Sequence, residues 1–156
     1  LQRTVQTAEA LAERMGLAIV VDERLAEYDF GAAISGLTWD SIRKQFPEII
    51  EALGREDSEY PRYPGEEGRA AFSARVSEAM AEVVERHAGE TVAVVTHAGP
   101  IVAYVLESLG RVYKRPVRFA ISNASMTTIE VGEPPSFASR VVAGLNDTCH
   151  WQAATG

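Results

Sequence analysis

The amino-acid sequence predicts an α/β protein, a three-layer α/β/α sandwich around a mostly parallel sheet. Short apolar segments of strand length alternate with longer segments of helical periodicity, as expected for strands joined by crossover helices. Residues 92–95 (VAVV) are apolar at every position, which is typical of a strand that helices cover on both faces. With 156 residues, the chain has the length of one domain.

The first part of the chain is predicted to form two helices and one strand. Apolar residues recur at helical spacing over residues 4–15, and Gly16 is suited to end that helix. Residues 18–21 (AIVV) have the pattern of a short buried strand. After a loop punctuated by glycines, Thr38 is a suitable N-cap for a helix that Pro47 interrupts.

The middle of the chain is predicted to hold a loop, two helices and the buried strand. Residues 54–68 are turn-rich and charged, so we expect a surface loop or lid there. A long amphipathic helix follows and ends at Gly89. Its predicted inner face consists of Phe72, Val76, Met80, Val83 and Val84. Beyond the strand at 92–95, Pro100 suits the first turn of a helix that Gly110 closes.

Two further strands are predicted in the last part of the chain. Residues 124–131 and 137–147 have strand composition, and the turn sequence GEPP separates them. They form either a hairpin or two neighbours within the larger sheet, and the sequence leaves these arrangements open.

The composition limits the classes of partner. The net charge of −7 disfavours a nucleic acid or an anionic membrane surface, although a local pocket can still bind a small anionic substrate. No apolar run approaches the ~20 residues that cross a bilayer. The single cysteine, Cys149, excludes an intrachain disulfide and is typical of a cytoplasmic protein.

His97 stands where the predicted strand at 92–95 ends and the next helix begins. Ligands of open α/β sheets bind beyond the carboxyl ends of the strands, and a helix N-terminus attracts anions. The small residues Ala98 and Gly99 leave room for a substrate near the backbone. We therefore predict that His97 binds a phosphate. The alternative is a histidine that only caps the helix.

Arg3 and Glu27 are two further candidates, and each has a structural alternative. Arg3 lies at the start of the first predicted helix, and its guanidinium can bind two phosphate oxygens at once. It could equally be an ordinary surface arginine. Glu27 lies between Leu25 and Phe30, and partial burial among them would favour the protonated form that a general acid needs. It could equally be a solvated loop carboxylate.

Four segments of the chain carry a family resemblance: LQRTVQTAEAL, RLAEYDFG, VVTHAGPI and NAS. Each segment alone identifies a family only weakly. The four segments together, in this order, identify one family specifically. They resemble the histidine phosphatase superfamily, the relatives of cofactor-dependent phosphoglycerate mutase, from residue 1 to about residue 129. The resemblance implies the phosphoglycerate mutase-like version of the α/β/α sandwich and an activity on phosphomonoesters.

The resemblance also implies a mechanism and a role for each site residue. In this family a histidine of an Arg-His-Gly motif attacks phosphorus and forms a covalent phosphohistidine, which is hydrolysed or passed on. By resemblance, Arg3 binds the phosphate, Glu27 protonates the leaving alcohol and then activates water, and His97 stabilises the transferring phosphoryl group. The backbone N–H of Ala98 is a further phosphate contact, and Asn123 supports the pocket. No metal and no cofactor is implied.

The nucleophile of this mechanism is not in the sequence, because the chain contains no Arg-His-Gly motif. We therefore expect an upstream segment, on the order of 50 to 60 residues and so longer than the ~30 of one βαβ unit, to carry it. That segment would also supply the central first strand. It either precedes residue 1 in the same protein or lies on a separate chain. Residues 1–156 would accordingly form a single domain that is incomplete at its N-terminus.

Three functions are compatible with these observations. The first is hydrolysis of a phosphorylated small molecule. The second is a phosphoglycerate mutase activity that uses the same covalent step. Mutases of the family tend to carry an insertion after the glutamate loop, and the short acidic stretch within residues 54–68 favours a phosphatase. The third is a non-catalytic binding module, which the absent nucleophile favours if no upstream segment exists.

Overall fold

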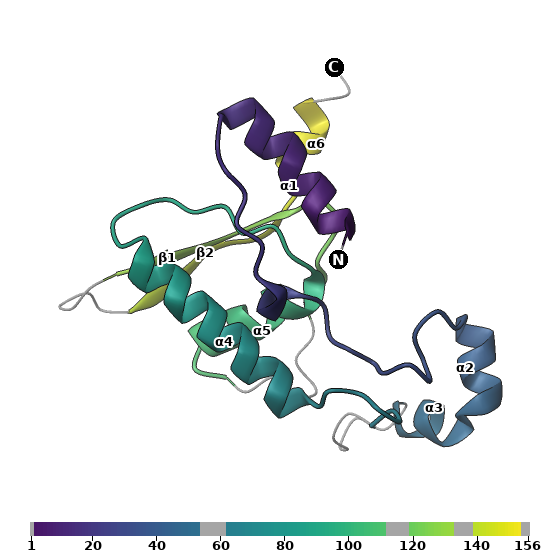
Figure 1. Ribbon diagram of the computed structural model, residues 1–156. Helices are drawn as coiled ribbons and strands as arrows, with labels where there is room; N and C mark the ends of the chain where they lie inside the picture. The colour runs from purple at the N-terminus through teal and green to yellow at the C-terminus, as the bar shows by residue number, and fades with distance from the viewer. Residues whose placement is uncertain (1, 54–61, 112–118, 133–138, 154–156) are drawn as a thin grey trace.

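The computed structural model describes residues 2–53, 62–111, 119–132 and 139–153. In chain order the elements are α1 (Gln2–Met15), the 3-10 turn η1 (Glu23–Leu25), α2 (Trp39–Gln45), α3 (Pro47–Leu53), α4 (Arg69–Arg86), α5 (Ala98–Ser108), β1 (Met126–Val131), β2 (Arg140–Asp147) and α6 (Cys149–Ala153). Figure 1 shows α4 and α5 on one side of the two strands and α1 and α6 on the other. Within these ranges, no helix combines the length and the apolar character that a membrane crossing requires.

The predicted helices of the first half are confirmed. α1 includes residues 4–15 and ends before Gly16, which adopts the left-handed conformation with φ 67°. α2 begins after Thr38, whose hydroxyl oxygen accepts a hydrogen bond from the Ser41 N–H over 3.2 Å. Pro47 then starts α3, because a proline at the first helical position lacks only an N–H that would have no partner there.

α4 and α5 pack against each other and form the main core. This core consists of Tyr28, Phe72, Val76, Ala103 and Tyr104. The predicted inner face of α4 is correct for Phe72 and Val76, and Ala79 is buried beside them. Met80 is only half-buried, and Ile129 of β1 packs against the same cluster. The core therefore joins two helices to one strand.

β1 and β2 are consecutive strands that pair directly and antiparallel, so of the two arrangements that the sequence left open the structure shows the hairpin. Ile129 faces Val142 across the pair. The first two residues of the second predicted strand, 137–138, lie outside the described residues. Arg140 attaches β2 to α5 through an ion pair with Glu107 at 2.6 Å.

The described residues do not form the predicted mostly parallel sheet, because the sheet within them consists of β1 and β2 alone. Residues 18–21 and 92–95, which were predicted to be strands, belong to no helix or strand, and no backbone hydrogen bond joins either segment to another part of the described chain. Val20 is 82% exposed and Val92 is 41% exposed, so the expected burial is not reached. An extended segment becomes a strand only where a neighbour donates and accepts along its edge.

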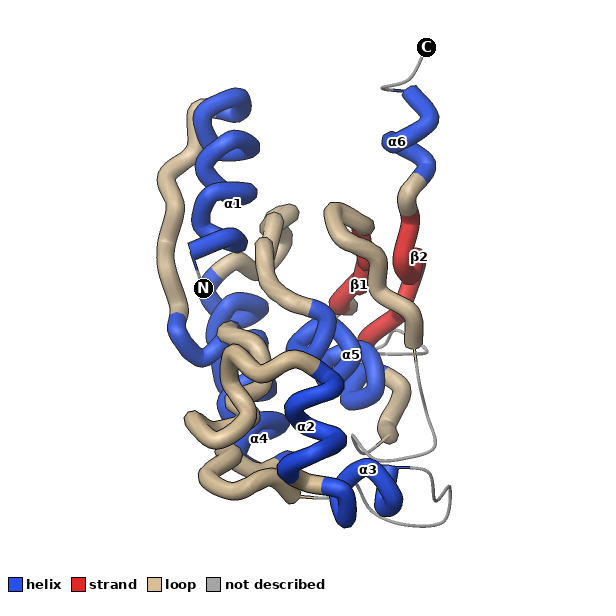
Figure 2. The backbone as a smooth tube through the Cα atoms, turned by 90° about the vertical axis from the view of Figure 1, so that its right-hand side faces the viewer, coloured by secondary structure: helices blue, strands red, loops and turns tan. Residues whose placement is uncertain are grey.

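α2 and α3 form a small lobe that projects from the rest of the chain (Figure 1), and Figure 2 shows both helices at the end of the molecule opposite α6. The lobe has its own small core, made of Ile34, Ile42, Ile49 and Tyr63. Tyr63 belongs to the predicted lid at 54–68, of which residues 54–61 lie outside the described part of the chain. The described part of that segment therefore packs onto the lobe through Tyr63.

Gly31 lies where two loops touch, and its replacement is expected to destabilise the fold. Its φ is 80°, and a Cβ there would lie 2.6 Å from the Pro64 carbonyl oxygen and from the Gly65 carbonyl carbon. Gly36 has a similar φ of 84°, but a Cβ there meets open space. We expect Gly36→Ala to lower the free energy of unfolding by about 1–2 kcal/mol. Gly31→Ala should lower it by about 2–5 kcal/mol, because overpacking adds to backbone strain. Urea unfolding measures both, and equal losses would contradict the contact.

Candidate active site

His97 joins the extended segment 92–96 to α5. It is the N-cap residue of α5, with an extended backbone (φ −114°, ψ 170°), but its side chain makes no capping hydrogen bond. The residue is buried, with 7% of its surface exposed. The structure therefore argues against a histidine that only caps the helix, and the ring nitrogens are left for other partners.

Arg3 reaches the His97 ring from α1. Its Nη2 lies 3.0 Å from Nδ1 of His97, although 94 residues separate the two in the sequence. A guanidinium donates hydrogen bonds and cannot accept them, so Nδ1 is the acceptor and the ring proton is assigned to Nε2. This contact distinguishes Arg3 from an ordinary surface arginine.

The environment of His97 favours the neutral ring. Burial and the neighbouring guanidinium of Arg3 lower the pKa of His97, and the carboxylate of Glu27 partly opposes this shift. The Nε2 atom is buried and has no hydrogen-bond partner among the described residues. A buried donor without an acceptor costs about 1–3 kcal/mol. The described site therefore lacks an acceptor for this proton.

Glu27 lies at the N-terminus of α5, beside His97. Its Oε1 accepts a hydrogen bond from the Tyr28 N–H (2.9 Å), and its Oε2 accepts one from the Gly99 N–H (3.3 Å). The second bond satisfies one of the first-turn N–H groups of the helix. A Cβ at position 99 would overlap the carboxylate and touch the ring of Phe72. The space at Gly99, which the sequence analysis assigned to a substrate, is thus taken by the Glu27 side chain.

Ala98 and Asn123 complete the predicted set of site residues. Ala98 is the exposed first residue of α5, so its N–H stands at the positive end of that helix. Asn123 is exposed in the turn before β1. Among the described residues, Arg3 and Glu27 interact with His97, whereas Asn123 has no hydrogen bond to any of the three. In the same ranges, no group of three His, Cys, Asp or Glu side chains could hold a metal ion.

The residues that hold the Glu27 loop were missed in the sequence analysis. Thr96 donates its hydroxyl hydrogen to the Leu25 carbonyl oxygen over 2.6 Å, directly before His97. Arg75 of α4 donates to the carbonyl oxygen of Glu27 over 3.0 Å. A signal was present in the sequence, because Arg75 stands at the edge of the apolar stripe of α4, where a charge has to find a partner.

The meeting of a buried histidine, an arginine and a glutamate at one helix N-terminus agrees with the comparison to known families. Residues 1–143 match the profile of the histidine phosphatase superfamily (branch 1). The chain belongs to this superfamily. The family resemblance stated from the sequence is thereby confirmed.

Three named proteins align with nearly the whole chain. Phosphoserine phosphatase 1 of Hydrogenobacter thermophilus is 31% identical over 150 residues, which are 96% of this chain and 68% of that protein. The "Probable phosphoglycerate mutase GpmB" of Enterobacter sp. is 31% identical over 156 residues, which are 98% of this chain and 71% of that protein. Among solved structures, Bacillus stearothermophilus YhfR is similar with a TM-score of 0.77 and 28% identity, over 95% of this chain and 71% of that chain. The α/β fold of this family is therefore shown for the chain.

Proposed function

We propose that the protein hydrolyses phosphorylated small molecules through a covalent phosphohistidine. The observation that carries this proposal is the contact of Arg3 with His97 at the N-terminus of α5, beside the Glu27 carboxylate. A guanidinium, an imidazole and a helix N-terminus are donors that suit the oxygens of one phosphoryl group. A phosphoryl oxygen would also accept the hydrogen bond from His97 Nε2–H, which has no acceptor among the described residues. The phosphoserine phosphatase among the relatives supports this substrate class.

The proposed reaction has two steps. In the first, a histidine nitrogen bonds to phosphorus, the bond from phosphorus to the leaving oxygen breaks, and the Glu27 carboxyl gives its proton to that oxygen. In the second, the Glu27 carboxylate takes a proton from water, the water oxygen bonds to phosphorus, and the phosphorus–nitrogen bond breaks. Inorganic phosphate then leaves. Arg3 and His97 stabilise the phosphoryl oxygens in both steps.

The nucleophilic histidine is proposed to lie on an upstream segment of the protein. The chain has three histidines. His87 pairs with Glu90 after the end of α4 (Nδ1 to Oε2, 2.9 Å), and His150 is exposed in α6. Neither has a described contact with Arg3, so neither is placed to attack a phosphate held there together with His97.

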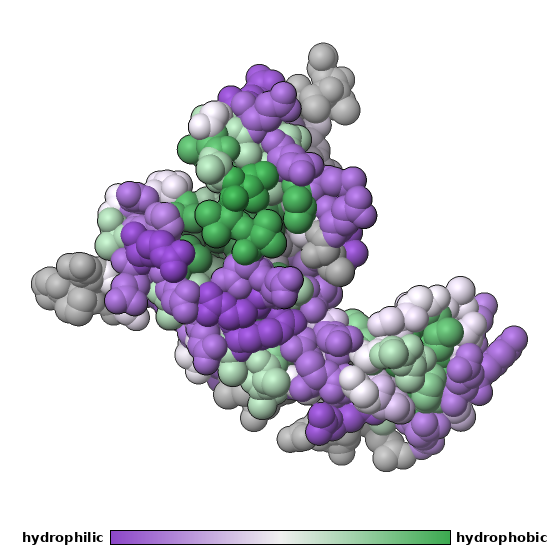
Figure 3. Space-filling view, viewed as in Figure 1, coloured by the Kyte–Doolittle hydropathy of each residue, from purple (hydrophilic) through white to green (hydrophobic). Residues whose placement is uncertain are grey.

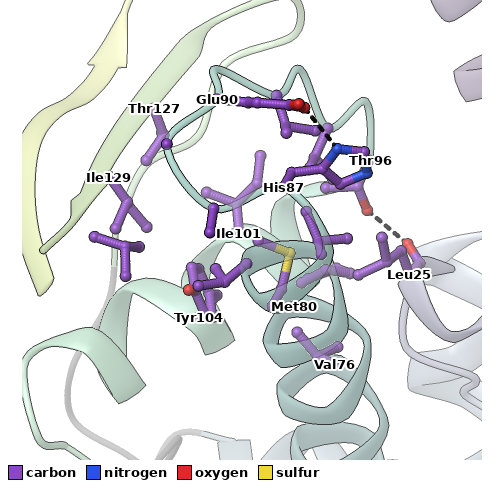
Figure 4. Close-up of a pocket in the computed structure, with 18 residues that line it drawn as sticks. Leu25, Val76, Met80, His87, Glu90, Thr96, Ile101, Tyr104, Thr127 and Ile129 are labelled. Carbon is purple, nitrogen blue, oxygen red and sulfur yellow. Dashed lines mark hydrogen bonds and ion pairs between the residues drawn. The ribbon is translucent and has the colours of Figure 1, made fainter. Parts of the chain in front are cut away.

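Two apolar grooves flank the extended segment 92–96. The larger has a volume of about 830 Å³ and lies between this segment, residues 17–21, α1 and α4. Figure 3 shows apolar surface gathered between α1 and α4. The smaller has a volume of about 260 Å³ and separates the segment from β1, with Thr96 and Ile129 among its lining residues (Figure 4). The backbone N–H and C=O groups of 92–95 have no described partner along either groove.

An upstream segment that places one strand in each groove would satisfy these groups. The two new strands would join residues 18–21, residues 92–95 and the β1–β2 pair into one sheet. Helices would cover both faces, which is the three-layer sandwich with a mostly parallel sheet that the sequence predicts. Parallel strands end at the same edge of a sheet, so a strand in the smaller groove would bring its last residues close to His97. We propose that the nucleophile lies there.

The test uses the protein with its upstream segment included. We expect turnover of p-nitrophenyl phosphate and of O-phosphoserine. Brief exposure to radiolabelled substrate should leave a protein-bound phosphate that survives base and is released by acid, as a phosphohistidine is. Peptide mapping should place the label upstream of residue 1. Turnover with the label on a carboxylate or a hydroxyl, or with the label on His87 or His150, would overturn the proposed nucleophile.

A mutase activity is the second candidate, because a relative named as a probable phosphoglycerate mutase aligns over 98% of the chain. A mutase transfers the phosphoryl group from the phosphohistidine back to the bound product. Incubation with 3-phosphoglycerate separates the two activities. A mutase forms 2-phosphoglycerate, whereas a phosphatase forms glycerate and inorganic phosphate. We expect phosphate release.

Arg3→Lys is expected to weaken phosphate binding. Lysine keeps the charge but cannot bridge two oxygens, and a hydrogen bond to a charged group is worth about 1.5–3 kcal/mol. Inhibition by inorganic phosphate should therefore weaken about 10- to 100-fold. Arg14→Lys is the matched control, since Arg14 is exposed in the last turn of the same helix. An inhibition constant that is the same for Arg3→Lys and the wild type would remove Arg3 from the site.

A further inference from the structure

We infer that Arg75 of α4, held by Glu67, is a positioning residue for the general acid Glu27. The inference rests on the proposed phosphatase function, because it assigns a role within that reaction. Neither Arg75 nor Glu67 touches the Arg3–His97 pair by a described hydrogen bond, so both would act through the loop that carries Glu27.

Most of the guanidinium N–H groups of Arg75 donate hydrogen bonds to that loop. Its Nη1 donates to the carbonyl oxygens of Arg24 (2.6 Å) and Ala26 (2.8 Å), and its Nη2 donates to that of Glu27 (3.0 Å). Residues 26 and 27 of this loop belong to no helix or strand. Their carbonyl oxygens therefore lack the backbone hydrogen bonds that a helix or a sheet would provide. The arginine supplies the missing donors, and it does so from a helix of the main core.

Glu67 holds the guanidinium in this orientation. The Nε and Nη2 atoms of Arg75 donate to the two carboxylate oxygens of Glu67 over 2.8 and 2.7 Å. The two residues thus form a bidentate ion pair. The same carboxylate accepts the N–H of Asp29, two residues beyond Glu27, over 2.8 Å. Burial raises the pKa of Glu67, but the bonds from Arg75 and Asp29 outweigh burial and hold the pKa below its ordinary value. The Glu67 carboxyl group is therefore ionised at neutral pH.

Two helices thus hold Glu27, one through its backbone and the other through its side chain. α4 holds its backbone through Arg75, and α5 holds its carboxylate through the Gly99 N–H. The packing of α4 on α5 consequently sets where the carboxyl group stands relative to His97. A misplacement of about 1 Å can cost a reaction on the order of 100-fold. Loss of Arg75 should therefore impair proton transfer although the acid itself is still present.

Arg24 provides a matched control. It attaches the same loop to the same helix, since its Nη1 and Nη2 donate to the Glu82 carboxylate over 2.9 and 2.8 Å. This attachment lies three residues before Glu27 and does not involve the Glu27 carbonyl. If Arg75 merely fastened the loop for stability, Arg24→Gln and Arg75→Gln would have the same kinetic effect.

The experiment measures kcat/KM of the protein with its upstream segment for phosphomonoesters of different leaving alcohols, from p-nitrophenol to simple alkanols. A poor leaving group needs the proton of Glu27, and a good one does not. We expect Arg75→Gln to lower kcat/KM about 30- to 100-fold for alkyl phosphates and less than about threefold for p-nitrophenyl phosphate. Glu67→Gln should show the same pattern. Arg24→Gln should change kcat/KM, relative to the wild type, by the same factor for every leaving group.

A second comparison isolates the coupling to Glu27. In a Glu27→Gln background, adding Arg75→Gln should leave the dependence on the leaving group unchanged, because no acid remains to be positioned. If Arg75→Gln does not fold, as judged by thermal unfolding, Arg75→Lys replaces it and should give an intermediate loss. A loss that is uniform over all leaving groups, or no loss, would overturn the positioning role. A wild type without phosphatase activity would instead overturn the proposed function.

Discussion

His97→Ala is expected to lower kcat/KM about 100- to 1000-fold, the loss typical of removing one preorganised donor from a developing negative charge. The ring is buried, it contacts the guanidinium of Arg3, and one of its nitrogens lacks a partner among the described residues. Because His97 acts on the phosphoryl group, the loss should be the same for good and poor leaving groups. Steady-state kinetics with p-nitrophenyl and alkyl phosphates measure it.

His150→Ala is the matched control for this variant, because His150 is exposed in α6. It should keep the wild-type kcat/KM. His97→Asn fills more of the buried space than alanine does, and it separates a loss of packing from a loss of chemistry. Thermal unfolding shows which variants are folded. A folded His97→Asn with wild-type kcat/KM would exclude His97 from the reaction.

Glu27→Gln is expected to make turnover depend steeply on the leaving group. The amide oxygen can still accept the N–H of Gly99, but the side chain has no proton to transfer. General acid catalysis contributes about 100- to 10,000-fold, so kcat/KM for alkyl phosphates should fall by that factor. The value for p-nitrophenyl phosphate should fall much less. Water activation is lost as well, so the labelled phosphoenzyme should accumulate.

Glu23→Gln is the control, since Glu23 is exposed in η1 of the same loop region. It should leave both the leaving-group dependence and the phosphoenzyme level unchanged. An equal loss of kcat/KM for all substrates in Glu27→Gln would assign Glu27 to phosphate binding and not to proton transfer.

Four of the described helices, α1, α2, α4 and α5, could be predicted because their signals are local. Thr38 bonds to an N–H three residues away, and Pro47 restricts its own backbone at the start of α3. Gly16 and Gly110 both take the left-handed conformation after a helix end. Each of these features depends on a few consecutive residues, so the sequence contains all the information that is needed.

The strands could be predicted only as extended segments. Residues 18–21 and 92–95 have the apolar pattern of strands, but a strand also needs neighbours that lie elsewhere in the chain. The described residues supply such a neighbour for β1 and β2 and not for the other two segments. The mostly parallel sheet therefore stays a prediction, and it depends on the proposed upstream segment.

By itself, the sequence determined the helices α1, α2, α4 and α5, the position of His97 at the start of α5, and the family. Tertiary structure alone decided that Arg3 lies 3.0 Å from His97, that Gly99 makes room for the Glu27 carboxylate, and that Arg75 holds the Glu27 loop. These contacts join residues that are 94, 72 and 48 positions apart. Local periodicity fixes which face of a helix is apolar, but the way α1, α4 and α5 pack sets which polar groups meet.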